Sequence, residues 1–446
     1  MKTSSTASLR FATISVFALL VSVSAPLARS TTLTWDPTGA PTSPVGGNGT
    51  WNTSAAQWSD GTNDQVWSTS TTNPDIAVFS NSGSVYTITL NTAVYAGGLS
   101  DVSTMNAVLS GTGSVTLTGS APLIAVTGAQ LSLNAVIQGT AGFEKTGAGI
   151  LRIGVGGGGT YTGVTKISAG QVTNDIDNGL SVNASLAMTG SSFLSLVGKN
   201  QSVAGLTGTS GTTVRSTSGT SNFTVTAGSG TFAGTLSDGS AAVRLNFINS
   251  GGSLTLSGTN SYRGTTTVSG GTLSLGSNLT GTSSVTVSGG TLTSTIANVN
   301  LGLGGTSMGS GAITPRGVGT AGTFTLAANQ TFTTTGGTLN FDLVSSSSFD
   351  QIIGSGSGTF SLTGTTLALS GLTSVAGTYQ LFNGFTSGSV SSLTVTGLNP
   401  AYSGVLDTNG ILTVSLSAIP EPSTLAALLG VAALGIAVLN RRRTHA

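Results

Sequence analysis

Side chains that could perform acid–base, nucleophilic or metal chemistry are few in this sequence. The chain has no cysteine, and its one histidine, His445, lies beside the C-terminal residue. A serine or threonine nucleophile in the body of the chain therefore has no imidazole to activate it. The lack of cysteine also excludes disulfides and thiolate metal sites. We expect no catalytic residue, no cofactor and no metal centre.

The closest groupings of charged side chains have simple structural interpretations. Asp175 and Asp177 stand in the segment NDIDNG, whose alternating oxygen ligands could hold Ca²⁺. The segment lacks a bidentate glutamate, and we interpret it as a polar turn. Glu144 and Lys145 are consecutive, so in a strand they point to opposite faces. We interpret both as solvated residues.

These side chains belong to short strands that repeat along the chain. In the stretch 247–276, FINSGGSLTLSGTNSYRGTTTVSGGTLSLG, apolar residues alternate with serine and threonine, which indicates strands with one buried and one wet face. Glycine and asparagine between them favour turns. The stretch 143–172, FEKTGAGILRIGVGGGGTYTGVTKISAGQV, follows the same pattern. Such a unit cannot bury its apolar face alone, so the repeats predict an all-β solenoid in which each turn covers its neighbour.

The repeated motif resembles a known family. The pattern K-x-G-x-G-x-L-x-L, followed by Y-x-G-x-T-x-V/I-x-x-G-x-L, is similar to the autotransporter-associated β-strand repeat. It stands at residues 145–172 and, in a more degenerate form with Asn249 in place of lysine, at 249–273. The resemblance implies a right-handed parallel β-helix in an exported surface protein, and it implies little about activity.

The N-terminal stretch 1–30 predicts a signal peptide. Lys2 and Arg10 precede an apolar segment at 11–25, and Ala28 and Ser30 supply small residues at the cleavage-site positions, with Thr31 as the new N-terminus. We expect export through the general secretory translocon and removal of the stretch by signal peptidase. An uncleaved membrane anchor is the alternative.

The C-terminal stretch 417–446 combines a Pro-Glu-Pro motif, an apolar run at 425–439 and a cluster of arginines. The motif and the cluster consist of Pro420, Glu421, Pro422, Arg441, Arg442 and Arg443. The apolar run predicts a single, short transmembrane helix. By the positive-inside rule the arginines stay in the cytoplasm, which leaves the body of the chain outside.

This order of parts resembles the PEP-CTERM sorting signal of Gram-negative bacteria. The resemblance implies recognition by an exosortase-type membrane protease that cuts near Pro420–Pro422 and releases or transfers the body. The anchor is then transient, and the motif residues are substrate rather than catalyst. An ordinary C-terminal anchor is the alternative.

Between its two ends the chain divides into three regions. Residues 31–84 hold all four tryptophans and predict an N-terminal cap with the first turns; residues 85–330 predict the β-helix; residues 331–416 predict a C-terminal β-module, partly antiparallel. Trp51 and Trp58 have a second interpretation, as a platform on which sugar rings stack.

Single polar residues within these regions have local interpretations. The pair Asn409-Gly410 predicts a hairpin turn in the C-terminal module. Asp342 and Asp350, in the same module, are interpreted as turn residues. Asn200 is interpreted as a plain turn residue, with an asparagine ladder inside the coil as the alternative.

The composition limits the partners of the protein. Only 6% of the residues are charged, and residues 31–419 contain eight Lys and Arg against twelve Asp and Glu, which gives a net charge of 8 − 12 = −4. Such a body argues against nucleic-acid binding, which needs basic surfaces. We predict a non-enzymatic structural or surface protein of the cell envelope or extracellular matrix, with exopolysaccharide as its partner. The alternatives are a glycan-binding adhesin and a carbohydrate-active β-helix enzyme.

Overall fold

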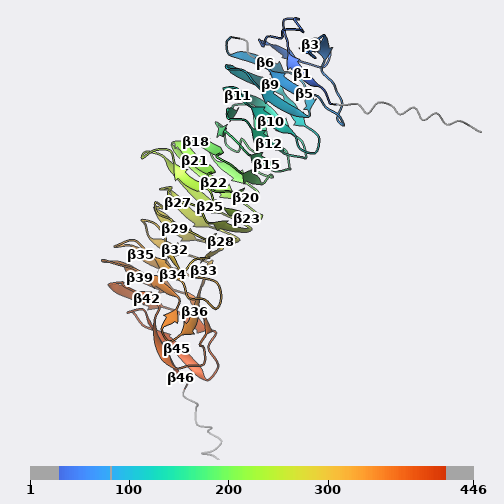
Figure 1. Cartoon of the computed structure of the whole chain (residues 1–446). Helices are drawn as coiled ribbons and strands as arrows, with labels where there is room; N and C mark the ends of the chain where they lie inside the picture. The colour runs from blue at the N-terminus through green and yellow to red at the C-terminus, as the bar shows by residue number, and fades with distance from the viewer. Residues whose placement is uncertain (1–29, 81–82, 418–446) are drawn as a thin grey trace, which may run out of the picture.

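The structure, a computed structural model, describes residues 30–80 and 83–417. Within these ranges every regular element is a β-strand, and the strands wind into a β-solenoid (Figure 1). The sixteen strands of its longest parallel ladder, spaced ~4.8 Å apart, make the stack about 70 Å long. The described residues include no helix long and apolar enough to cross a membrane. The transmembrane helix expected at 425–439 lies outside the described residues.

Sheet A is the ladder that runs along the whole solenoid, with nearly every turn adding one parallel strand. The ladder continues in the same way through the C-terminal half. Its strands are β1 (Thr32–Trp35), β5 (Ile76–Phe79), β8 (Gly98–Asp101), β10 (Leu123–Val126), β12 (Phe143–Thr146), β15 (Thr165–Ile167), β17 (Leu186–Met188), β20 (Leu206–Gly208), β23 (Ser229–Phe232), β26 (Ser253–Leu256), β28 (Thr272–Leu275), β30 (Thr291–Ser294), β33 (Ala312–Thr314), β36 (Thr338–Ser345), β40 (Thr366–Gly371) and β44 (Thr394–Thr396).

Sheets B and C form the other two long faces, and each covers only part of the length. Sheet B contains β2 (Gly49–Trp51), β6 (Tyr86–Leu90), β9 (Asn106–Leu117), β11 (Gln130–Gln138), β13 (Ile150–Ile153), β16 (Gln171–Asn174), β18 (Phe193–Val197), β21 (Thr213–Ser218) and β24 (Thr235–Asp238). Two short strands, β7 (Val94–Ala96) and β14 (Gly158–Gly159), pair with β9 and β11 in the same sheet. Sheet C contains β19 (Gln201–Val203), β22 (Thr220–Val225), β25 (Arg244–Asn249), β27 (Thr265–Val268), β29 (Ser284–Val287), β32 (Thr306–Met308), β35 (Thr331–Thr334), β39 (Thr359–Thr363) and β43 (Ser387–Ser391).

Sheet B stops at β24, and a short sheet D begins three turns later. In the two turns between them, single residues form isolated parallel bridges, Leu236 with Asn260 and Asn260 with Leu279. Sheet D then contains β31 (Asn298–Asn300), β34 (Thr323–Thr325), β38 (Gln351–Ile353) and β42 (Phe382–Asn383). The interruption changes the shape of the surface at this corner.

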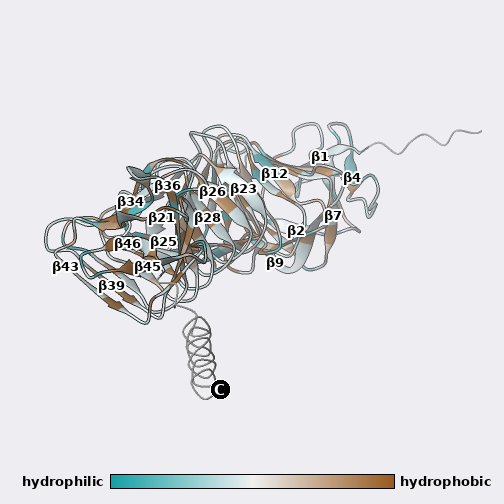
Figure 2. Ribbon diagram, turned by 90° about the horizontal axis from the view of Figure 1, so that it is seen from below, coloured by the Kyte–Doolittle hydropathy of each residue, from teal (hydrophilic) through white to brown (hydrophobic). Residues whose placement is uncertain are grey.

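The core is one continuous column of apolar side chains that extends from the first turn to the last. The alternation in the strands produces it, because every second side chain points inward, and Figure 2 shows brown and paler residues alternating along the strands. Leu254, Leu273, Leu292 and Ile313, for example, are paired in turn across four sheet-A strands and are fully buried. Each turn therefore hides the apolar face of the next, as the repeats predicted.

The two repeat copies lie on different faces of the solenoid. In the first copy β12 belongs to sheet A and β13 to sheet B; in the second copy β25 belongs to sheet C and β26 to sheet A. The shared motif therefore specifies a corner rather than a face. At the corner of the second copy Gly252 and Gly271 both have positive φ, and a Cβ on Gly271 would lie 2.1 Å from the carbonyl oxygen of Gly252. Only glycine permits both the turn and the close stacking.

The two ends of the stack depart from the parallel pattern. At the N-terminal end β1 pairs antiparallel with β3 (Ala56–Ser59), which pairs antiparallel with β4 (Asp64–Val66). At the C-terminal end β41 (Gly377–Gln380), β45 (Tyr402–Leu406) and β46 (Ile411–Leu416) form an antiparallel sheet. The hairpin turn at Asn409-Gly410 is confirmed between β45 and β46. The parallel ladders continue past residue 331 as far as β44, so the antiparallel part is smaller than the expected module.

All four tryptophans pack together under the N-terminal strands. Trp58 lies with its ring centroid 4.7 Å from that of Trp51 and 4.5 Å from that of Trp67, and it also contacts Trp35. Each of the four side chains is at most 1% exposed. This cluster closes the end of the core, as a cap requires.

We predict that Trp58→Ala lowers the free energy of unfolding by about 3–5 kcal/mol, because a large buried ring is replaced by a cavity. The loss should be concentrated in the first turns, since each turn contacts only its neighbours. Urea unfolding with amide hydrogen exchange measures both effects. Val318→Ala, at an 87% exposed position, is the control. Equal stability of the two variants would contradict the capping role.

Candidate functional site

Lys145 lies inside the solenoid, which corrects the expectation of a solvated side chain. It is fully buried and is stacked in register between Ile124 and Ile167. Burial lowers its pKa to about 8. Its Nζ donates hydrogen bonds to three carbonyl oxygens at the corner, those of Thr146 at 2.8 Å, Gly147 at 2.9 Å and Ala169 at 3.2 Å. The lysine therefore links two successive turns from within.

Asn249 performs the corresponding task in the second repeat copy. It is fully buried, and its Nδ2 donates to the carbonyl oxygen of Gly270, one turn further on, at 2.9 Å. Ser294 is a third case, with Oγ donating to the carbonyl oxygen of Pro315 at 2.6 Å. All three residues place an inward-pointing hydrogen-bond donor just before a corner, where it reaches a carbonyl oxygen of the next turn. This shared requirement explains why asparagine can replace lysine in the motif. This role is structural rather than chemical.

Glu144 lies on the outer face, as expected for a neighbour of Lys145 in the same strand. Its carboxylate pairs with Lys166 of the next turn at 3.0 Å and accepts a hydrogen bond from Ser168. The hydrogen bond from Ser168, together with Lys166, lowers the pKa of Glu144. This pair is a surface link between turns.

Asp175 and Asp177 also connect neighbouring turns. Asp175 forms an ion pair with Arg152, and Asp177 Oδ1 accepts a hydrogen bond from the backbone N–H of Asn200 at 2.7 Å. These contacts agree with a polar turn. The described ranges contain no group of three or more His, Cys, Asp or Glu side chains that could hold a metal ion.

Asn200 begins an asparagine ladder, but on the surface rather than inside the coil. Its Oδ1 accepts from the backbone N–H of Asn222 at 3.0 Å. Asn222 Oδ1 accepts from Asn246 Nδ2 at 2.8 Å, and Asn246 Oδ1 accepts from the backbone N–H of Thr265 at 2.9 Å. Side-chain amides thus reinforce the backbone ladder across four turns at one corner.

Asp342 and Asp350 are buried, so the interpretation of both as simple turn residues is wrong. Asp350 is fully buried and accepts backbone N–H groups from Gly322 at 2.6 Å and Asp342 at 3.0 Å. Burial raises its pKa to about 7. Asp342 lines a cavity of about 260 Å³, and its two oxygens accept from Ser370 and from the backbone of Gly319. Both carboxyl groups fasten loops to the solenoid.

Trp51 and Trp58 contradict the sugar-platform interpretation. Both are 0% exposed, and their rings are covered by other aromatic side chains of the cap. A pyranose ring has no access to either face. The sorting residues Pro420, Glu421, Pro422, Arg441, Arg442 and Arg443 lie outside the described residues.

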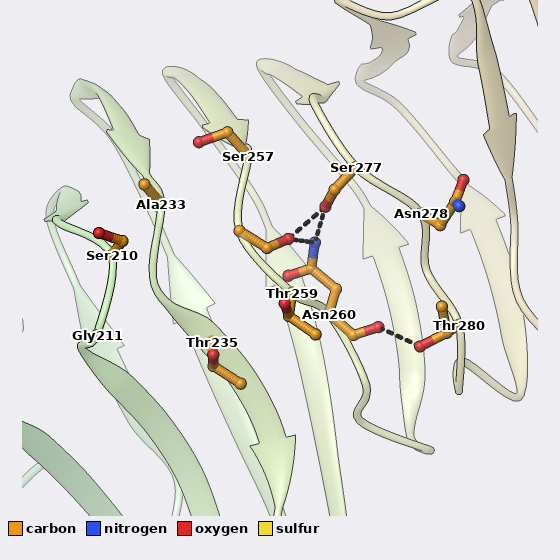
Figure 3. Close-up of a pocket in the computed structure, with 11 residues that line it drawn as sticks. Ser210, Gly211, Ala233, Thr235, Ser257, Thr259, Asn260, Ser277, Asn278 and Thr280 are labelled. Atoms are coloured by element: carbon orange, nitrogen blue, oxygen red, sulfur yellow. Dashed lines mark hydrogen bonds between the residues drawn. The ribbon is translucent and has the colours of Figure 1, made fainter.

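A groove of about 410 Å³ lies at the corner where sheet B is interrupted (Figure 3). We call it the corner groove. Four successive turns line it, and all the lining side chains are uncharged. The lining residues are Ser210, Gly211, Ala233, Thr235, Ser257, Gly258, Thr259, Asn260, Ser277, Asn278 and Thr280. No motif in the sequence marks this groove, because it results from strands that are missing.

Asn260 fixes the shape of the corner groove. It is 1% exposed, and its Nδ2 donates to Ser277 Oγ at 2.9 Å and to the carbonyl oxygen of Gly258 at 3.1 Å (Figure 3). Thr280 Oγ1 donates to the carbonyl oxygen of Asn260 at 3.1 Å. The side chain thus substitutes for the backbone pairs that a sheet-B strand would have made.

A second groove, of about 300 Å³, lies on the outer face of sheet B, and we call it the sheet-B groove. It contains the Arg152–Asp175 ion pair. The lining residues are Asn106, Val108, Ser132, Asn134, Arg152, Gly154, Val155 and Asp175. This groove offers charged groups, whereas the corner groove offers only hydroxyls, amides and backbone.

Comparisons with known proteins agree with both sequence resemblances. The chain matches the Passenger-associated-transport-repeat at residues 143–173 and 249–275, and the PEP-CTERM protein-sorting motif at residues 418–443. These matches place autotransporter-type repeats and a sorting motif in one chain. With the β-solenoid, they indicate an exported, cell-surface protein.

A curated protein is similar to part of this chain. It is the adhesin BmaC autotransporter of Brucella suis biovar 1 (strain 1330), 30% identical over 201 residues. The matched region covers 42% of this chain and 6% of that protein. The chain therefore spans a small fraction of the length of the relative it matches.

We predict that the free energy of unfolding rises as the pH increases from about 8 to about 9.5, and that Lys145→Met flattens this slope. The pKa of Lys145 is lower in the folded chain than its ordinary value of 10.5. The folded chain therefore binds fewer protons than the unfolded chain in this window, and stability rises with pH. Urea titrations across the window measure the slope.

Lys166→Met, at an exposed ion pair, is the matched control and should keep the slope of the wild type. The window ends at pH 9.5 because ionisation of buried tyrosines lowers the free energy of unfolding at higher pH. Tyr161 and Tyr262 have pKa values raised to about 12 by burial. An identical slope in wild type and Lys145→Met would contradict the internal position of Lys145.

Proposed function

We propose that this protein is a non-enzymatic structural or adhesive component of the cell surface or extracellular matrix. In this proposal an exosortase-type system sorts it after export. The observation that carries the proposal is that ionisable side chains of the solenoid make structural contacts. Lys145, Asp175, Asp177, Asp342 and Asp350 each contact a neighbouring turn or fasten a loop to the solenoid.

The outer faces of the solenoid support the same proposal. On sheet A the outward side chains of β26, β28 and β30 form two columns in register. These are Ser253, Thr272 and Thr291 in one column and Thr255, Ser274 and Thr293 in the other. A rod with uncharged hydroxyl faces stays soluble without attracting polyanions, which suits a spacer or matrix element outside the cell.

A glycan-binding adhesin is the second candidate. The relative named as an adhesin supports it, and so do the two grooves, which offer polar groups in concave sites. A carbohydrate-active enzyme is the third candidate. Its support within the described residues is Asp342, which lines a cavity close to the buried Asp350. Hydrolysis of a matrix polysaccharide that is lost in Asp342→Asn would replace our proposal.

We predict that replacing Pro420, Glu421 and Pro422 with alanine leaves the C-terminal segment attached, because the protease no longer recognises its site. In cells that contain an exosortase, mass spectrometry should then find the longer chain in the membrane fraction. Ser423→Ala with Thr424→Ala is the neighbouring control and should be processed normally. Unchanged processing of the triple variant would reject sorting by this route.

A further inference from the structure

The corner groove owes its existence to the loss of one strand in each of two turns. After β24 the chain crosses this corner with only Asn260 and Leu279 in bridge pairs, and a full strand returns at β31. The corner is consequently hollow over four stacked turns, whose first and last are about 14 Å apart at the usual strand spacing. The groove is thus long enough for an extended ligand.

Half of the polar side chains that line the corner groove have unused hydroxyl groups. Within the described part of the chain, the hydroxyl groups of Ser210, Thr235, Ser257 and Thr259 have no hydrogen-bond partner, although all four residues line the groove. Figure 3 shows them at the edges of successive turns. At the base, Oδ1 of the 1%-exposed Asn260 is a buried acceptor without a partner. The groove therefore presents unused hydroxyl groups on three successive turns, with an unpartnered amide oxygen buried beneath them.

We propose that the corner groove binds a segment of a neutral polysaccharide. Anionic ligands are not favoured, because no cation lines the groove. Lipids are not favoured either, since hydroxyls and amides supply most of the lining side chains. A sugar chain carries hydroxyls along its length that can pair with the unused hydroxyls on three successive turns. Its C–H faces can pack on the exposed backbone at Gly211, on the half-buried backbone at Gly258 and on the methyl group of Ala233.

Binding at a single groove is expected to be weak. Each hydrogen bond to a sugar replaces one to water, so the net gain per bond is small. Many copies on one surface would then hold a polysaccharide through simultaneous contacts. This inference concerns ligand recognition and does not depend on how the chain is sorted.

The test is affinity electrophoresis of the exported protein in gels that contain dextran, mannan or xyloglucan, with polygalacturonate as the anionic comparison. The variant Thr235→Ala, Ser257→Ala, Thr259→Ala removes three free hydroxyls from the groove. The control Thr265→Ala, Thr267→Ala, Ser284→Ala removes three hydroxyls from the outer face of sheet C over the same turns. Equal urea midpoints for the two variants establish that both fold.

We expect retardation by at least one neutral polysaccharide, and a dissociation constant raised about tenfold in the groove variant, as the loss of about one to three net hydrogen bonds predicts. The control should bind like the wild type. The proposal is overturned if no neutral polysaccharide retards the protein, or if the groove variant binds as tightly as the control. Retardation by polygalacturonate alone, abolished by Arg152→Gln, would also overturn it and would assign binding to the sheet-B groove.

Discussion

Stacking of one turn on the next is the interaction on which this structure depends. A single turn has one apolar side chain at every second position of its strands and too few residues to enclose them. Only an adjacent turn in register can cover them, and the parallel backbone hydrogen bonds enforce that register. The buried column from Leu33 to Val414 is the result. The two ends are the exceptions, and there antiparallel strands, with a tryptophan cluster at the first turn, cover the core instead.

Corners are where the stacking requirement becomes most demanding. Strands can repeat with any apolar inward side chain, but a corner brings backbone carbonyls of successive turns close together without a strand to pair them. Glycine meets the steric demand, as at Gly252 and Gly271. A buried donor meets the polar demand, and Lys145, Asn249 and Ser294 show that an ammonium, an amide and a hydroxyl can each supply it. The repeat motif therefore specifies a corner, and that corner can connect any two faces of the solenoid.

Much of the fold could be predicted from the sequence, and the parts that could not have identifiable reasons. Alternation and turn residues predicted the strands, the stacking and the hairpin at Asn409-Gly410, and the clustered tryptophans predicted the cap. The burial of Lys145 was missed because charge suggested solvent, although alternation with the outward Glu144 places the lysine inside. The corner groove was missed because it arises where a strand is absent in two turns. Sequence patterns indicate where strands form, and they do not indicate a hollow left between them. The sorting residues were found by their motif alone.

Native-state hydrogen exchange on a Gly271→Ala variant would test the central claim most directly. A side chain at this corner would collide with the carbonyl oxygen of Gly252 in the turn below. If stability resides in contacts between adjacent turns, protection should fall in β26, β28 and β30 and persist at the tryptophan cap in β1 and β3. A uniform loss of protection along the chain, or no loss at all, would contradict a solenoid that is stabilised turn by turn.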